Sequence, residues 1–418
     1  MAATPKSPIE VALPPGIGSI DALVAEEAVT SAYRFLEQNQ RWIDDQHLTI
    51  CQIPAPTFCE RQRAEWFLDQ FSSFGLSARM DRAGNVLATS NDMPRTAPLV
   101  ALTAHLDTVL APSEASQIEA SKGKLRGPGV SDNGAGLAAL LAIAKAYSAR
   151  PFVQGPAYPL FVANVGEEGE GNLSGMRFLC RPSPLLNRIR TFVVLDGPST
   201  DHVTSEALAC RRFDVSVTGP GGHSWADHGT ANPIHALARL VTTFLEMRSA
   251  RKGEKRSSHN FGVIDGGSTV NAIPSSARAK VDLRSADPDT LERMVRDLTA
   301  ATEAALAAEN AQAIAGRLAV SVRETGSRPG GQLDPSARIL GYIRAIDQHL
   351  GIRSWPDCAS TDANVPLSMG IEAISIGAGG TGGGAHTPAE WYSHEGRNTG
   401  LRRIVLLLSL LLAGASEQ

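Results

Sequence analysis

The sequence predicts an α/β protein with a second, α+β domain inserted into it. Short apolar runs alternate with helix-like segments over much of the chain, and this order of elements produces a sheet flanked by helices. Between residues 209 and 324 the order changes to strand, helix, strand, strand, helix, strand, which is typical of a split ferredoxin-like unit. The α/β pattern returns after Pro335. We therefore predict a discontinuous outer domain, 1–208 and 325–418, and an inserted domain, 209–324.

The composition excludes several classes of partner. The chain has 418 residues, 20% of them charged, and a net charge of -4. This length is enough for two domains of roughly 150 residues each. A nearly neutral chain has no strong field to attract nucleic acid or an anionic membrane, so we predict neither partner. The five scattered cysteines are typical of a reducing compartment and favour a cytoplasmic protein.

The first ninety or so residues are predicted to be scaffold. The first twenty contain several prolines but no apolar core of signal-peptide length, so they predict a lead-in segment rather than a secretion signal. The spacing is helical from Ile20 to Leu48, and Thr49–Pro56 interrupts it with two prolines. Glu60–Phe74 is helical again, with apolar residues on one face. Gly84-Asn85 lies between strand-like residues and predicts a hairpin or a tight turn.

The strand Leu99–Ala104 forms the centre of the predicted sheet. It is a continuous apolar run, which indicates burial on both faces, and His105 and Asp107 follow it at once. Open α/β sheets bind ligands where the strands end at their carboxyl termini. We therefore expect both residues at a functional edge, although a His-x-Asp pair alone is more often ordinary loop or core structure.

The same arrangement recurs in later segments, where polar residues follow an apolar run or precede an apolar helix. The segments are SDNGAG at 131–136, LFVANVGEEGEG at 160–171, FVVLDGP at 192–198 and AISIGAGGTGGGAHT at 373–387. They add the side chains of Asp132, Glu167, Glu168, Asp196 and His386. So many carboxylates at one sheet edge would be unfavourable without cations to neutralise them. The sequence therefore predicts a cation site.

Each of these residues also has an ordinary structural interpretation. Asp132 lies beside the start of a helix and could cap it. The EEGE run that contains Glu167 and Glu168 is a common composition for a solvated acidic turn. The histidines could be core residues with satisfied hydrogen bonds. A strand of apolar residues that delivers the two glutamates to the sheet edge favours the functional interpretation.

The inserted domain and the end of the chain complete the predicted elements. The strands are expected at Arg212–Val217, Val263–Ile273, Ala279–Leu283 and Leu318–Val322, and the helices at Pro233–Met247 and Asp289–Asn310. Near the end, the apolar run Ile404–Ala413 is too short to span a bilayer of about 30 Å. It predicts a buried terminal helix.

The ordered motifs resemble a known family. AHLDT, SDNGAG, GEEGEG, VVLDGP, GGHSW, GGSTVNAIP, DLRS and GAHTPAEW, from about Leu99 to Trp391, are similar to motifs of the M20 metallopeptidases, the group of carboxypeptidases, aminoacylases, dipeptidases and peptidase T. The resemblance implies a zinc-peptidase-like catalytic domain with a mixed central sheet and an inserted lid or dimerisation domain. It also implies two zinc ions, or cobalt or manganese, about 3.5 to 4 Å apart.

The resemblance assigns roles by motif position. It implies these metal ligands: His105 and Asp196 for one metal, Glu168 and His386 for the other, and Asp132 bridging both. Asp107 would orient His105, and Glu167 would be the general base. Zinc accepts imidazole and carboxylate ligands and keeps a position open for water in catalytic sites. Because successive side chains diverge, one of the adjacent glutamates is expected to bind metal while the other faces the water.

Three residues of the inserted domain resemble residues that contact substrate in this family. His223 in GGHSW and Asn271 in STVNAIP would stabilise the oxyanion, and in dimeric members the histidine reaches the partner's site. Arg284 in DLRS would bind a substrate carboxylate, for which a bidentate guanidinium is suited. Local turn or sheet structure is the alternative for all three.

These observations predict a metal-dependent hydrolase of amide or peptide bonds in small substrates. Asp196 stands where acylase-like and carboxypeptidase-like relatives tend to have glutamate, which favours a di- or tripeptidase. A deacylase of N-acyl amino acids shares every catalytic residue and stays the first alternative. A catalytically silent metal-binding relative is the second. A homodimer through the lid domain is a further expectation.

Overall fold

The computed structural model describes residues 12–112, 117–153, 155–251 and 255–414. The chain divides into two compact units, one formed by Met1–Glu206 and Gln332–Gln418 and the other by Ala207–Gly331. Residues 1–11 of the predicted lead-in lie outside the described residues. Pro14 and Pro15 precede the first helix.

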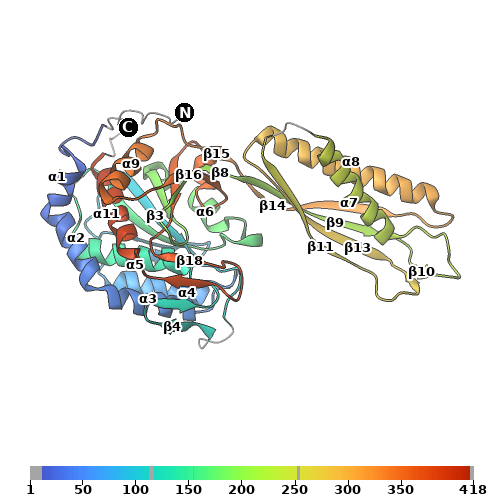
Figure 1. Ribbon diagram of the computed structural model, residues 1–418, viewed down its shortest axis with the longest axis horizontal. Helices are drawn as coiled ribbons and strands as arrows, with labels where there is room; N and C mark the ends of the chain where they lie inside the picture. The colour runs from blue at the N-terminus through green and yellow to red at the C-terminus, as the bar shows by residue number, and fades with distance from the viewer. Residues whose placement is uncertain (1–11, 113–116, 154, 252–254, 415–418) are drawn as a thin grey trace, which may run out of the picture. The chain divides into compact units, whose positions relative to one another are not determined.

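A mixed sheet forms the centre of the first unit (Figure 1). Its strand order is β1-β2-β6-β3-β7-β17-β8-β15, and β16 pairs with β8. Strands β6, β3, β7 and β17 run parallel, while β2 and β8 pair antiparallel at either side of them. The bounds are β1 Ser77–Met80, β2 Val86–Thr89, β3 Leu99–His105, β6 Tyr158–Asn164, β7 Ile189–Leu195, β8 His202–Ala207, β15 Gly331–Gln332, β16 Trp355–Ala359 and β17 Glu372–Ile376. This arrangement confirms the predicted α/β class, the central strand and the hairpin at Gly84-Asn85.

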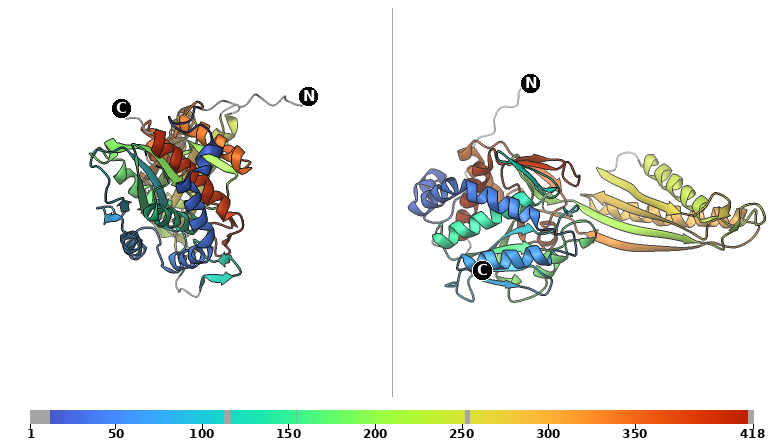
Figure 2. Two further views of the ribbon diagram at one scale, coloured as in Figure 1. Left: turned by 90° about the vertical axis from the view of Figure 1, so that its left-hand side faces the viewer. Right: turned by 90° about the horizontal axis from the view of Figure 1, so that it is seen from below.

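Helices flank this sheet (Figures 1 and 2). Their bounds are α1 Ile20–Ala25, α2 Glu27–Gln38, α3 Gln40–Gln52, α4 Arg61–Ser73, α5 Gly134–Ala149, α6 Ser174–Leu179, α9 Arg338–Leu350, α10 Asn364–Ser368 and α11 Arg397–Gly414, with short 3-10 turns at Gly169–Gly171 and Leu186–Arg188. The predicted helix end at Leu48 is wrong by one turn, because α3 continues to Gln52. It stops there since Ile53 precedes Pro54 and adopts an extended conformation.

The core of the first unit is built from α5, α11 and the parallel strands. Leu99 to His105 are all buried, and α5 is buried on nearly its whole circumference, as its run of alanines and leucines requires. The buried terminal helix is confirmed as the major part of α11. Among the described helices, none combines the length and apolar character needed for crossing a bilayer.

A small antiparallel sheet in the order β18-β19-β5-β4 completes the first unit. Its strands are β4 Glu119–Ser121, β5 Lys124–Arg126, β18 Thr381–Gly383 and β19 Trp391–Ser393. Trp391 pairs with Arg126, so the segment after the last parallel strand is held beside the segment that precedes α5.

The second unit has the predicted order of elements. It contains β9 Ala209–Thr218, β10 Gly222–His223, α7 Pro233–Ala250, β11 Ser257–Gly266, β12 Ala272–Ile273, β13 Ser276–Ser285, α8 Pro288–Gln312 and β14 Ala319–Arg328. The four-stranded sheet has the order β11-β13-β9-β14, and its alternate residues pack against α7 and α8. The β-α-β-β-α-β prediction is confirmed. The strand predicted at Val263–Ile273 is wrong, because β11 starts at Ser257 and ends at Gly266.

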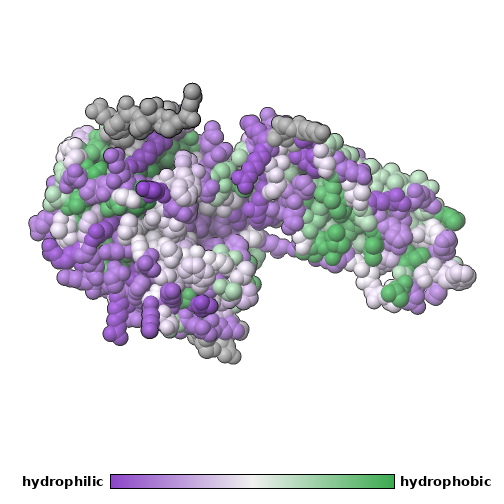
Figure 3. Space-filling model, in the orientation of Figure 1, coloured by the Kyte–Doolittle hydropathy of each residue, from purple (hydrophilic) through white to green (hydrophobic). Residues whose placement is uncertain are grey.

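The second unit exposes several large apolar side chains. Figure 3 shows hydrophobic residues gathered over α7 and near β10. The exposed side chains include Trp225, Ile234, Leu245, Ile264 and Val270. Apolar side chains that gather into a patch on the surface are typical of a site that contacts another protein.

Candidate metal centre

The predicted polar residues meet at the carboxyl ends of the parallel strands. His105 is the last residue of β3, Asp196 follows β7, and Glu167 and Glu168 follow β6. His386 lies between β18 and β19, and its φ of 65° lies in the left-handed region that non-glycine residues seldom adopt. Asp132 comes from the turn before α5. Parallel strands share one carboxyl edge, which explains why segments so distant in sequence converge.

The first donor group consists of His105, Asp132 and Asp196, whose ligand atoms lie within 4.8 Å of one another. His105 Nε2 is 3.2 Å from Asp132 Oδ1 and 3.9 Å from Asp196 Oδ1. The His105 side chain is only 1% exposed. These are the residues that the sequence assigns to one metal and to the bridge.

The second donor group consists of Asp132, Glu168 and His386. His386 Nε2 lies 3.1 Å from Asp132 Oδ2 and 2.9 Å from Glu168 Oε1. Asp132 therefore presents one carboxylate oxygen to each histidine, as a bridging carboxylate does. Its alternative role as a helix cap is excluded, because Asn133 caps α5 with its own side chain.

The donor set fits two divalent cations. Each group offers imidazole nitrogen and carboxylate oxygen, the ligands that zinc and related metals take in proteins. Asp132 Oδ1 is buried and receives no well-formed hydrogen bond within the described part of the chain. A buried carboxylate oxygen that lacks a hydrogen bond and lies near an imidazole nitrogen is a suitable ligand for a cation.

The charge balance of the centre supports the same conclusion. Burial alone would lower the pKa of His105, but the surrounding carboxylates outweigh burial and hold it well above its usual value. Hydrogen bonds with Asp132 and Glu168 raise the pKa of His386 to about 10. Burial would raise the pKa of Asp132, yet the two imidazoles hold it well below its usual range. In the absence of metal, the histidines thus keep protons that neutralise the carboxylates.

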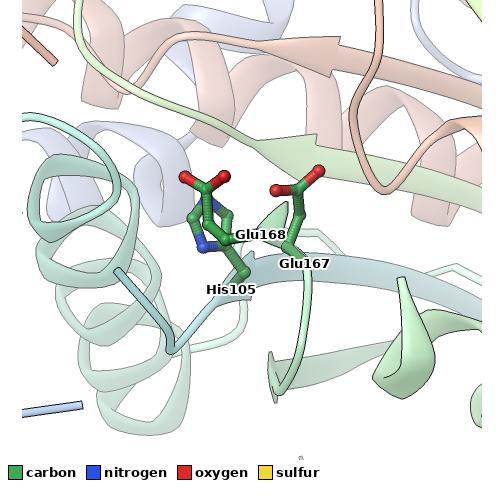
Figure 4. A group of neighbouring side chains, drawn as sticks. All are labelled: His105, Glu167 and Glu168. Carbon is green, nitrogen blue, oxygen red and sulfur yellow. The ribbon is translucent and has the colours of Figure 1, made fainter. Parts of the chain in front are cut away.

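Glu167 and Glu168 lie side by side. Figure 4 shows both carboxylates pointing the same way near the imidazole of His105, and the ligand atoms of all three residues lie within 4.8 Å. The expectation that the two side chains diverge is wrong. Side chains alternate only within a strand, and β6 ends at Asn164, so these residues belong to a loop with Gly166 in a left-handed conformation.

The Asp107 side chain holds the loop that carries Glu167 and Glu168 through hydrogen bonds. Its carboxylate is fully buried and accepts the backbone N–H groups of Glu167 and Glu168 at 3.0 and 2.9 Å. Thr57 Oγ1 donates to it at 3.0 Å. His105 Nδ1 lies 3.0 Å from the backbone carbonyl of Asp107 and 3.6 Å from its carboxylate. The backbone carbonyl is thus the nearer partner of the imidazole, while the carboxylate mainly organises the glutamate loop.

The structure also reveals buried polar residues that the sequence analysis missed. Asn164 Nδ2 donates to Asp362 Oδ2 at 2.6 Å, and burial raises the pKa of Asp362 to about 7. Arg63 donates to the carbonyl of Leu106, and Glu390 accepts amides from the turn that carries Asp132. Glu390 belongs to the motif GAHTPAEW, which was a usable signal. Asp362 comes from a distant segment, and no local pattern identifies it.

The predicted substrate-binding residues belong to the second unit. The amide of Ser224, next to His223, donates to the carbonyl of Asn271 at 3.0 Å, so His223 and Asn271 are neighbours. His223 Nδ1 accepts the amides of Trp225 and Ala226, which leaves the proton of the neutral imidazole on Nε2.

Arg284 is not part of this pair. It lies on β13, and its Nε donates to Asp282 at 2.6 Å. The structure therefore brings His223 and Asn271 together, whereas Arg284 pairs with Asp282.

Comparison with known families agrees with this architecture. Residues 211–329 match the family described as "Peptidase dimerisation domain". Residues 85–225 match the description "Peptidase family M28". The first match covers the inserted unit, and the second covers the strands and loops that carry most of the metal centre.

Two known proteins are similar to this chain in sequence, at low identity. The chain is 22% identical over 355 residues to the uncharacterized protein YqjE of Bacillus subtilis, covering 82% of this chain and 91% of that one. It is 26% identical over 279 residues to the cytosol non-specific dipeptidase of Escherichia coli, covering 59% and 54%.

Two solved structures illustrate the shared fold. A tripeptidase from Staphylococcus aureus matches with a TM-score of 0.71 at 20% identity, covering 90% of this chain and 99% of that one. The YxeP protein of Bacillus subtilis, described as a dinuclear metal-binding peptidase from the M20 family, matches with a TM-score of 0.65 at 13% identity, covering 91% and 100%. The two family matches, which together span residues 85–329, relate the chain to the M20 and M28 zinc peptidases. The two solved structures show that it shares their fold.

Proposed function

We propose that this hydrolase cleaves the peptide bonds of di- and tripeptides with a pair of divalent cations, most naturally zinc. The observation that carries the proposal is Asp132, which presents one oxygen to the His105 side of the centre and the other to the His386 side. The likeness to a tripeptidase and the aspartate at position 196 support small peptides as substrates.

The ligand roles follow from the two donor groups. His105 and Asp196 would hold one cation, Glu168 and His386 the other, and Asp132 would bind both. When bound, the cations would polarise the scissile carbonyl and lower the pKa of a shared water. Cobalt or manganese would fit the same ligands.

Glu167 is the proposed general base. Its carboxylate lies beside Glu168 and near His105, and the ligand atoms of these three residues lie within 4.8 Å of one another. From there it would accept the proton of the attacking water and return that proton to the leaving amine. Asp107 would hold Glu167 in place through the backbone amide.

The second unit would contribute to substrate binding. His223 carries its neutral-state proton on Nε2, so it can donate to a developing oxyanion. Asn271 would act beside it, and Arg284 would have to exchange Asp282 for a substrate carboxylate. The dimerisation domain and its exposed apolar side chains support a homodimer, and the free cysteines support a cytoplasmic location.

Hydrolysis of a mixed panel tests the proposal. Metal-free protein is reconstituted with zinc, cobalt or manganese and assayed with dipeptides, tripeptides and acetyl- or succinyl-amino acids, with a chelated sample as control. Chelator-sensitive release from peptides is the expected result. Cleavage confined to acyl amino acids would assign the protein to the deacylases, and absence of turnover with two metals bound would favour a silent relative.

A further inference from the structure

Glu390 is a buried carboxylate at the edge of the metal centre that none of the proposed roles uses. Its residue is only 2% exposed. Oε2 accepts the backbone N–H of Gly129 at 2.8 Å. Oε1 accepts those of Ser131 at 2.7 Å and Asp132 at 2.8 Å. The carboxylate therefore lies inside the turn that leads to the bridging aspartate.

The turn is shaped around this carboxylate. Gly129 has a φ of 74°, and a Cβ there would lie 2.5 Å from Thr108 Cγ2, so only glycine fits. The backbone carbonyl of Glu390 also accepts the N–H of Gly127 at 2.9 Å. Glu390 thus accepts hydrogen bonds from four backbone N–H groups of this turn, those of Gly127, Gly129, Ser131 and Asp132.

Glu390 also lies four residues after His386, in the segment between the histidine and β19. One carboxylate therefore connects the segment that carries His386 with the turn that carries Asp132. Asp132 contacts His386 directly, at 3.1 Å from Nε2. Hydrogen bonds from backbone amides to an ionised carboxylate are among the stronger kinds in proteins, so this connection is stiff.

We propose that Glu390 is a positioning residue of the metal centre: it fixes the backbone at Ser131 and Asp132 so that the Asp132 carboxylate faces both cation positions. The inference rests on the proposed dimetal function. Glu390 is not itself a ligand in this arrangement, because both its oxygens already accept backbone amides.

A glutamine cannot replace this carboxylate. Its side chain offers one oxygen instead of two, and its NH₂ group would face a backbone N–H in either orientation. The variant Glu390→Gln therefore removes acceptors at constant size. Glu390→Asp keeps both oxygens but is one methylene shorter, so it should retain part of the connection.

Glu372 provides a matched control. It is a partly buried glutamate: its Oε2 accepts Thr191 Oγ1 at 2.7 Å and Arg338 Nη2 at 3.4 Å, and its Oε1 accepts the N–H of Ile339 at 3.3 Å. It begins β17, whereas the metal centre lies beyond the carboxyl ends of the parallel strands. Glu372→Gln thus alters partly buried hydrogen bonds without touching the turn at Asp132.

The test is a titration of metal-free, full-length protein with cobalt(II), followed by visible absorption and calorimetry, with circular dichroism to check folding. Wild type should bind two cobalt ions. Glu390→Gln should fold and bind cobalt roughly 10- to 100-fold more weakly, the usual loss on removing a group that orients a metal ligand. Glu390→Asp should lie between the two, and Glu372→Gln should match wild type.

Wild-type cobalt affinity in both Glu390 variants would overturn the proposal. An equal loss in Glu372→Gln would also overturn it, because the effect would then be a general one on stability. If Glu390→Gln does not fold, Glu390→Asp decides, and failure of both would show that the carboxylate serves the whole fold. A wild type that does not bind two cobalt ions would instead refute the dimetal function itself.

Discussion

Replacing Asp107 by asparagine should impair catalysis strongly while leaving the fold intact. The carboxylate holds the loop of Glu167 and Glu168 by accepting one backbone amide on each oxygen. Asparagine has the same shape but only one acceptor oxygen. In either orientation, its NH₂ group faces one of these two amides, so one proposed catalytic residue loses its anchor.

The structure gives a magnitude for this loss. A buried N–H left without an acceptor costs about 1–3 kcal/mol, and the surviving bond loses roughly 1 kcal/mol when its acceptor becomes neutral. Together these make about 2–4 kcal/mol. If this is the free energy needed to return the loop to its catalytic position, kcat/KM should fall by roughly 30- to 1,000-fold, because a tenfold change in rate corresponds to 1.36 kcal/mol. Metal affinity should fall by up to about 100-fold.

The assay is kcat/KM on the best peptide substrate, with metal content measured on the same sample and stability measured by urea unfolding. Asp287→Asn is the matched control. Asp287 caps α8 in the second unit and accepts the N–H and hydroxyl of Thr290, so its loss should lower stability only. If Asp107→Asn keeps wild-type kcat/KM in folded protein, the anchoring argument is refuted.

The remaining predictions concern pH, stability and the second unit. Metal-free His105 and His386 have folded-state pKa values above the unfolded value, so both hold protons at pH 7 and cation binding must release them. Cobalt affinity should therefore rise as pH rises toward about 10, and calorimetry in buffers of different ionisation enthalpy should detect released protons; no release would contradict this. Asp347→Asn should lower the free energy of unfolding by about 3–5 kcal/mol without changing activity per folded molecule. Asp347 binds the buried guanidinium of Arg403 through both carboxylate oxygens, and the substitution leaves that charge without its ion-pair partner. A change below 1 kcal/mol would contradict that. His223→Ala should reduce kcat about 100-fold at unchanged metal content, as expected for an oxyanion donor worth about 3 kcal/mol; an unchanged kcat would remove His223 from catalysis.

The sequence predicts the buried elements well and the exposed ones poorly. The strand Leu99–His105 is evident because its residues before the histidine are apolar except for Thr103. In contrast, β11 begins at Ser257, and its exposed residues carry no apolar alternation that would reveal a strand. The predicted helix from Ile20 onward is divided at Glu26 and Asn39, neither of which is a proline or glycine.

The same distinction applies to the metal centre. Residues that directly follow strands are predictable because all parallel strands end at one edge, and the structure brings His105 and Asp196 together there. The supporting contacts depend on tertiary structure. Asp362 reaches Asn164 across 198 residues of sequence, and Glu390 reaches Gly129 across 261. The spacing of residues along a single helix or strand does not reveal contacts between segments so far apart in the sequence.

The most direct test of the proposed mechanism is the variant Glu167→Gln, assayed for metal content and peptide turnover on one preparation. If Glu167 is the general base, the variant should retain two metals per chain and lose turnover by about 100- to 10,000-fold. Turnover close to that of wild type would contradict the account. Loss of metal from the variant would contradict it as well, because Glu167 would then be a ligand rather than the base.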